Sequence, residues 1–214
     1  MKAIIYDLDG TLLYTLEDLA NAVNYSLNKH GHKSRSISEI RDFIGNGVTV
    51  LMNRCTDFKC TEDEIATLLS DFTPRYLSHM YDTTKPYDGV IDVMKQLKAQ
   101  GYAQAIASNK LDSAVKELND SFFEGLCDAA IGAPQDKRKP NPEVINLCLK
   151  ELNLNKEDVI YIGDTEVDLE TSANAGIKCI AACWGFRDKS YLKEKGATMF
   201  AESPKDLINI ISSL

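Results

Sequence analysis

The 214-residue sequence contains no apolar run near the roughly 18 residues that a membrane-spanning helix needs. Its first residues also lack the features of a secretory signal peptide, because a short apolar stretch reaches Asp7 almost at once. We therefore expect a cytoplasmic protein without a membrane partner.

Paired cysteines are absent as well. The six cysteines are scattered, form no C-x-x-C pair, and several lie in apolar contexts such as KCIAACWG. This usage is typical of free thiols in a reducing compartment and argues against disulfides or a structural zinc site.

Positive charge is also in short supply. The net charge of −8 argues against a general nucleic-acid binder or a protein that docks on anionic membranes. An anionic small substrate stays compatible with this charge if local cations or a metal ion offset the acidic background. The chain is 44% hydrophobic and 26% charged, which suits one large globular domain or one domain with a small insert.

Short apolar runs recur along most of the chain, and most are nearly continuous rather than alternating. Such runs are typical of parallel strands that are buried on both faces. They span residues 3–7, 102–108, 128–133, 158–164 and 178–185. Helical patterns at Val90–Gln100 and Pro142–Leu152 lie between them. This alternation predicts an α/β fold with a doubly wound, Rossmann-like parallel sheet.

Strand patterns are missing from residues 15–84, where apolar residues recur at helical spacing. We predict an all-helical insert over 15–84 and an α/β core formed by 1–14 and 85–214. Thr15 is the expected N-cap of the first helix, Ser38 that of the second, and Thr61 opens a capping box. Pro74 is expected to kink or interrupt the last helix of the insert.

Polar side chains follow three of the predicted strands at the points where these strands end. They are Asp7 and Asp9, the run Ser108-Asn109-Lys110, and Asp164 with Asp168 close behind. In open parallel α/β sheets, sites lie outside the carboxyl ends of the strands. A turn explains Asp9, and a helix dipole is an equal explanation for Asp168, but Asp7 ends a buried run where a bare charge is costly.

A divalent cation would offset these carboxylates. Mg²⁺ favours oxygen ligands together with water and substrate phosphate. Lys139 lies in DKRKPNPEV, which is a surface charge run by default, although Pro140 and Pro142 stiffen the backbone there. A positive group held in this way suits an acidic, phosphate-binding site.

These segments resemble the four motifs of the haloacid dehalogenase superfamily and occur in the same order. The matching segments are DLDGTL at 7–12, SNK at 108–110, Lys139-Pro140, and GDTEVD at 163–168. The helical insert resembles the C1 cap of that superfamily. DFIGNG, KPYDGV and SNK are similar to the phosphoglycolate phosphatase branch.

The resemblance implies an Mg²⁺-dependent phosphatase in which Asp7 attacks phosphorus and forms an aspartyl-phosphate that water then hydrolyses. Asp9 would protonate the leaving group and later take a proton from water. The metal ligands would be the Asp7 carboxylate, the Asp9 carbonyl and Asp164, with Asp168 acting directly or through water. The phosphoryl oxygens would be held by Ser108, Asn109 and Lys139, with help from backbone N–H groups near Asp9 and Gly10 and from Thr11. Lys137 is the fallback for Lys139.

The cap is expected to close over the substrate and exclude water. Asn46 and Gly47 of the Gly45-Asn46-Gly47 loop are the expected cap contacts with the substrate. Tyr14 departs from the acid or amide that many relatives carry there, which affects substrate fit more than chemistry.

Several reactions remain open on the same core. The leading hypothesis is hydrolysis of a small phosphorylated metabolite such as phosphoglycolate. Inorganic pyrophosphate and a sugar phosphate are the alternative substrates. A sugar phosphomutase is a second reading, and a non-catalytic phosphoacceptor signalling domain is a distant third. The sequence does not determine the oligomeric state.

Overall fold

The structure is a computed structural model that describes residues 2–214. Its contacts divide the chain into two compact units, Met1–Tyr14 with Pro86–Leu214 and Thr15–Lys85. Among the described residues, no helix has the length and apolar character needed to cross a bilayer.

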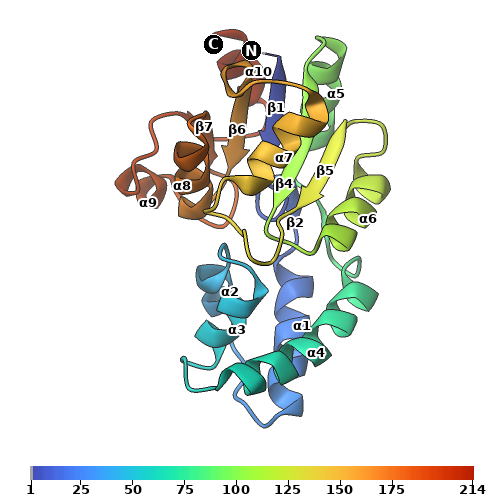
Figure 1. Cartoon of the computed structure of the whole chain (residues 1–214), viewed down its shortest axis with the longest axis vertical. Helices are drawn as coiled ribbons and strands as arrows, with labels where there is room; N and C mark the ends of the chain where they lie inside the picture. Colours follow the sequence, from blue (N-terminus) through green and yellow to red (C-terminus); the bar gives the residue numbers. More distant parts are fainter. Residues whose placement is uncertain (1) are drawn as a thin grey trace. The chain divides into compact units, whose positions relative to one another are not determined.

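The larger unit is built on a six-stranded, fully parallel sheet with the order β5-β4-β1-β6-β7-β8 (Figure 1). The strands are β1 (Ala3–Tyr6), β4 (Ala103–Ser108), β5 (Ala129–Gly132), β6 (Val159–Gly163), β7 (Lys178–Ala182) and β8 (Phe200–Ala201). β1 and β6 are buried along their whole length, which explains their continuous apolar sequences.

Helices cover both faces of this sheet. α7 and α8 pack together on one face, whereas α5 and α10 pack together on the other. The helices of this unit are α5 (Val90–Ala99), α6 (Asp112–Phe122), α7 (Glu143–Leu152), α8 (Glu166–Ala175), α9 (Lys189–Glu194) and α10 (Asp206–Ser212), with a 3₁₀ turn at Lys156–Asp158. The prediction of a doubly wound α/β fold is confirmed.

Three short strands have no counterpart in the sequence pattern. β2 (Leu13–Tyr14) and β3 (Lys85–Pro86) pair with each other, and β8 extends the main sheet. Each has only two residues, which is too short to show any periodicity.

The smaller unit is helical, with α1 (Leu16–Lys29), α2 (Ile37–Phe43), α3 (Val48–Cys55) and α4 (Glu62–His79). The apolar stripe of α1 is buried and α1 packs mainly against α4. The capping box of α4 is present, with the Thr61 side chain and Glu64 bonded reciprocally.

The local expectations for this unit had different outcomes, and the predicted Ser38 cap was wrong. α2 is capped by Ser36 rather than Ser38, because Glu39 stands three residues after Ser36 and completes a capping box. Thr15 is the N-cap residue of α1 as expected, although its side chain makes no capping bond and its buried hydroxyl has no hydrogen-bond partner among the described residues. α4 continues through Pro74, so the expected interruption is absent from this helix and a kink at Pro74 stays a prediction.

Candidate active site

The central strands bring three polar segments to one edge of the sheet. β1 pairs with both β4 and β6, so that Tyr6 stands beside Ile106 and Ile162. Each of these three strands ends at most two residues after its member of this aligned set, Tyr6, Ile106 or Ile162. Asp7, Ser108 and Asp164 therefore emerge side by side at the carboxyl ends, where parallel sheets place their sites.

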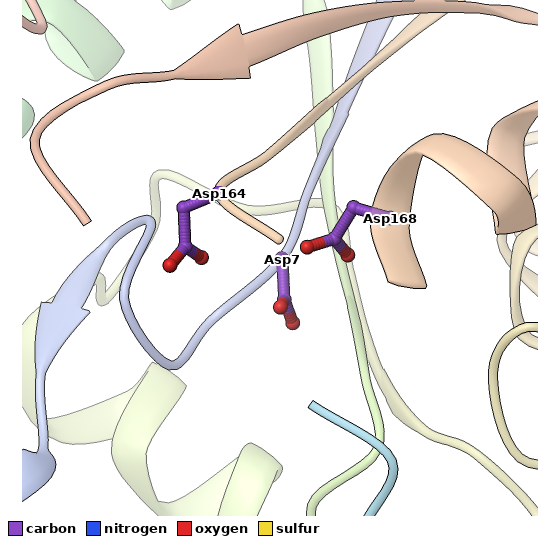
Figure 2. A group of neighbouring side chains, drawn as sticks. All are labelled: Asp7, Asp164 and Asp168. Carbon is purple, nitrogen blue, oxygen red and sulfur yellow. The ribbon is translucent and has the colours of Figure 1, made fainter. Parts of the chain in front are cut away.

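Three buried carboxylates form the centre of this edge. Ligand oxygens of Asp7, Asp164 and Asp168 all lie within 4.8 Å of one another. Figure 2 shows that they come from the end of β1, the loop after β6 and the first turn of α8, and that they gather around one space. Asp164 and Asp168 are fully buried, and Asp7 is 7% exposed.

Asp164 is held by two hydrogen bonds, one to each oxygen. The Thr11 hydroxyl donates to Oδ1 at 2.8 Å, and the Phe186 backbone N–H donates to Oδ2 at 2.7 Å. Gly10 has a φ of 86°, and a Cβ on it would lie 2.3 Å from Asp164 Oδ2. Only glycine therefore fits between the first turn and this carboxylate.

Lys139 supplies the positive charge at the centre. Its Nζ lies 2.9 Å from Asp7 Oδ1 and 2.7 Å from Asp168 Oδ1, and it donates to the Tyr161 hydroxyl at 3.0 Å. The Lys139 side chain is only 2% exposed. The prediction that one amine of the DKRKP run is held in a fixed direction matches this geometry.

Asp168 is surrounded by donors. The Thr165 backbone N–H and hydroxyl donate to Oδ2 at 3.0 and 2.8 Å, while Lys139 and the Tyr161 hydroxyl bond to Oδ1. A carboxylate offers about four lone-pair sites. These four donors occupy them, so Asp168 serves both as a cap of α8 and as an anchor for Lys139.

Burial and mutual repulsion perturb the ionisation of these groups. Burial raises the pKa of Asp7 to about 7, against the lowering effect of Lys139 and with support from Asp168 and Asp9. Burial, together with Asp168 and Asp7, also raises the pKa of Asp164. Burial acts in the same direction on Asp168, but Lys139 and Thr165 outweigh it and hold the pKa of that carboxyl below its usual value.

Asp9 lies outside the carboxylate cluster and has its own cation. Lys110 Nζ donates to Asp9 Oδ1 at 2.6 Å and to Oδ2 at 2.8 Å. The side chains of Lys110 and Asp9 are 6% and 18% exposed, so the pair is shielded without being sealed. Whether the Asp9 carbonyl binds a metal stays a prediction.

The two predicted phosphate ligands on β4 differ in their contacts. Ser108 is buried, and its hydroxyl accepts a bond from the Lys110 backbone N–H at 3.3 Å. The Asn109 side chain accepts from the Lys139 backbone N–H at 2.6 Å and donates to the Lys139 carbonyl at 3.1 Å. Asn109 thus fixes the backbone that carries the lysine.

Asn46 and Gly47 belong to the helical unit, where Gly47 is the N-cap of α3. Arg54 donates to the Asn46 side chain at 2.8 Å and to the Phe43 carbonyl at 2.6 Å, which ties the loop to α3. Their predicted contact with substrate stays a prediction.

Sequence reasoning missed three contributors to this site. Tyr161 lies within a predicted strand, Lys110 ends the SNK motif, and Phe186 follows the last predicted strand, and none of them is given a role there. The signal for Tyr161 was a hydroxyl within an otherwise apolar strand. Its side chain needs a polar partner when buried.

The donor set fits a small divalent cation. It consists of oxygen atoms, as Mg²⁺ prefers, and Lys139 offsets only one of the three carboxylates of the cluster. Two negative charges would remain in a buried place when all three are ionised, and such charges need a partner. Thr11 and Phe186 hold the Asp164 oxygens in position.

A parallel sheet with an acidic centre at the ends of its middle strands defines an α/β enzyme. The Haloacid dehalogenase-like hydrolase family model matches residues 4–182. The chain belongs to this family.

Known relatives agree with this assignment. The chain is 28% identical over 215 residues to the phosphoglycolate phosphatase of Aquifex aeolicus, covering 100% of this chain and 98% of that protein. It is 32% identical over 192 residues to a phosphoglycolate phosphatase of Cereibacter sphaeroides, covering 87% of each. A crystal structure of a predicted phosphoglycolate phosphatase from Haemophilus somnus superposes with a TM-score of 0.90 at 25% identity and covers 99% of this chain and 98% of that chain. This chain is accordingly a hydrolase that acts on phosphoric esters.

Proposed function

We propose that this protein is an Mg²⁺-dependent phosphatase that hydrolyses a small phosphomonoester of the phosphoglycolate type through an aspartyl-phosphate. The observation that carries the proposal is the contact of Lys139 with Asp7 inside the Asp7–Asp164–Asp168 cluster. The names of the relatives support the substrate class.

Asp7 is the proposed nucleophile. Among the described residues, the Leu8 N–H and the Lys139 ammonium both bond to Oδ1, at 2.7 and 2.9 Å. This supports attack by Oδ2 on phosphorus, with the bond to the leaving oxygen breaking as the new P–O bond forms. A carboxylate is a weak nucleophile, so orientation and charge compensation supply most of the rate.

Asp9 is the proposed acid and base. Its carboxyl gives a proton to the leaving oxygen in the first step and takes one from the attacking water in the second. Its distinct surroundings support this division of roles, because Asp9 pairs with Lys110 and stands apart from the three-carboxylate cluster.

Lys139 and Ser108 are the proposed holders of the phosphoryl oxygens, with Asn109 positioning Lys139. Asp7 and Asp164 would hold Mg²⁺ directly together with the Asp9 carbonyl, and Asp168 would contribute its nearby negative charge rather than a ligand atom, because four donors already occupy its oxygens. When bound, the metal would neutralise charge on the transferring phosphoryl group.

The test is phosphate release from a panel of phosphomonoesters and pyrophosphate, with Mg²⁺ or with EDTA, for the wild type and for Asp7→Asn. We expect hydrolysis of phosphoglycolate with Mg²⁺, and a loss of at least about 10³-fold in D7N because the nucleophile is gone. Activity in D7N, or full activity in EDTA, would contradict the proposal. Asn46→Ala in the same panel tests the cap prediction, with Asn53→Ala as a control in the same helical unit.

A further inference from the structure

We propose that Lys110 binds the carboxylate of the leaving group and thereby selects acidic phosphomonoesters, an inference that rests on the proposed function. Lys110 bonds to both oxygens of Asp9 at 2.6 and 2.8 Å. The ammonium is thus fixed beside the group that would protonate the leaving oxygen.

The placement of Lys110 follows from the chain itself. It stands two residues after Ser108, and its backbone N–H donates to the Ser108 hydroxyl at 3.3 Å. The leaving oxygen must come within hydrogen-bond distance of Asp9 to receive its proton. The leaving oxygen itself is then at most about two hydrogen-bond lengths, or roughly 6 Å, from the Lys110 ammonium, so a substituent on it that is directed toward Lys110 comes within its reach.

The distribution of charge singles out this lysine. The described residues contain three buried cationic side chains, Lys110, Lys139 and Arg187. Lys139 contacts the Asp7–Asp164–Asp168 carboxylate cluster and Arg187 pairs with Glu166. Of these three, Lys110 is the one that contacts the proposed acid.

A phosphomonoester with an acidic leaving group carries two anionic groups, the phosphoryl group and a carboxylate. The protein that binds it has a net charge of −8. Lys139 and a metal ion held by the carboxylate cluster would bind the phosphoryl group. The substrate carboxylate therefore needs a separate cation. An ammonium carries three N–H donors, so Lys110 can change from two bonds on Asp9 to bonds shared between Asp9 and a substrate carboxylate. The lysine stays paired throughout, which avoids leaving a buried charge bare.

The test compares two esters that differ in one group. Phosphoglycolate carries a carboxylate where ethyl phosphate carries a methyl. We expect the wild type to prefer phosphoglycolate in kcat/KM. Lys110→Met should lower the ratio of kcat/KM for phosphoglycolate to kcat/KM for ethyl phosphate by about 10- to 100-fold. This is the effect expected when a hydrogen bond between charged groups is lost. Lys110→Arg should retain most of the preference, and Lys116→Met, which removes an exposed partner of Asp112, should leave the ratio unchanged.

A ratio is used because Lys110→Met also disturbs Asp9, and that effect applies to both esters. Inhibition by 3-phosphonopropionate and by propylphosphonate, which cannot be hydrolysed at a C–P bond, gives the same comparison without any proton transfer. If the wild type hydrolyses phosphoglycolate but K110M keeps both ratios within about threefold of the wild type, the role of Lys110 is overturned and the proposed function stands. If the wild type hydrolyses no phosphomonoester, the proposed function itself fails.

Discussion

The Lys139 ammonium lies 2.9 Å from Asp7 Oδ1 and joins the proposed nucleophile to the rest of the site. The same nitrogen contacts Asp168 and the Tyr161 hydroxyl. The site therefore depends on a lysine whose ammonium contacts residues from three different segments, the end of β1, β6 and α8.

Replacing Tyr161 by Phe removes the hydroxyl that Lys139 and Asp168 share. We expect the free energy of unfolding to fall by about 1–2 kcal/mol, because a buried network loses a member. We also expect kcat to fall by about tenfold with little change in KM, since Lys139 is held less firmly. Urea unfolding and steady-state kinetics measure these two effects.

Tyr6→Phe is the matched control, because the buried Tyr6 hydroxyl donates to Gln104 at 2.8 Å in the interior of the sheet. This variant should lose similar stability and keep its kcat. Equal kcat losses in the two variants would mean that Tyr161 acts only through stability.

Replacing Gly10 by Ala tests the close approach of the first turn to Asp164. The new Cβ would meet Asp164 Oδ2 and also the Phe186 ring, at 2.3 and 2.7 Å. We expect Mg²⁺ affinity, measured by calorimetry, and phosphatase activity to fall by at least about 10-fold, as is typical when the surroundings of a metal ligand are disturbed.

Gly101→Ala provides the comparison. Gly101 has a φ of 88°, close to the 86° of Gly10, but nothing lies within 4 Å of its Cβ position. Both variants should be destabilised by about 1 kcal/mol of backbone strain. Only G10A should show reduced Mg²⁺ affinity. Retention of normal Mg²⁺ affinity by G10A would contradict the arrangement described here.

The stability of the metal-free protein should fall as the pH rises from about 4 to above 7. Burial raises the pKa of Asp7 from its ordinary 3.8 to about 7 in the folded chain, so the folded state binds this proton more tightly than the unfolded state. The resulting stability is present below the unfolded value and is lost as the pH passes the folded one. Urea unfolding in EDTA between pH 5 and 8 measures this dependence.

Mg²⁺ should oppose that loss, since binding to the folded state alone adds about 2.7 kcal/mol at 100 times the dissociation constant. Asp7→Asn should flatten the pH dependence in EDTA. A profile in D7N as steep as that of the wild type would assign the titration to another group.

Asp18 should stabilise the helical unit at neutral pH. Its buried carboxylate accepts bonds from the backbone N–H groups of Thr83 and Thr84 and from the Thr83 hydroxyl. Burial alone would raise its pKa, but these bonds outweigh it and bring the value below 3.8. Asp18→Asn should cost about 1–3 kcal/mol.

The cost of Asp18→Asn should shrink as the pH falls through the depressed folded pKa, because the wild-type carboxylate is then protonated too. Asp71→Asn, which removes a solvent-screened partner of Lys29, should have a much smaller effect on stability than Asp18→Asn. A pH-independent difference between wild type and D18N would show that packing rather than charge is lost.

Much of the fold can be read from local pattern. The buried runs at β1 and β6, the stop of α5 before Gly101 and the Thr61 capping box all depend on neighbours in sequence. Ser38 was the wrong cap because Ser36 offers the same chemistry with Glu39 at the better spacing. The two-residue strand β8 is defined by its pairing with β7. Two residues are too few to produce a periodic sequence pattern that would predict it.

The sequence by itself determined the chemistry available to this protein. The strand-ending residues Asp7, Ser108 and Asp164 could be named because apolar runs are local properties of the chain, whereas Asp9 and Lys139 were assigned through the resemblance of their motifs. Tertiary structure alone decided the pairing of these groups. Lys139 contacts Asp7 and Asp168. Lys110 contacts Asp9, which lies 101 residues away in the sequence. Such contacts depend on which strands lie side by side, and the sheet order that decides this is a property of the whole core.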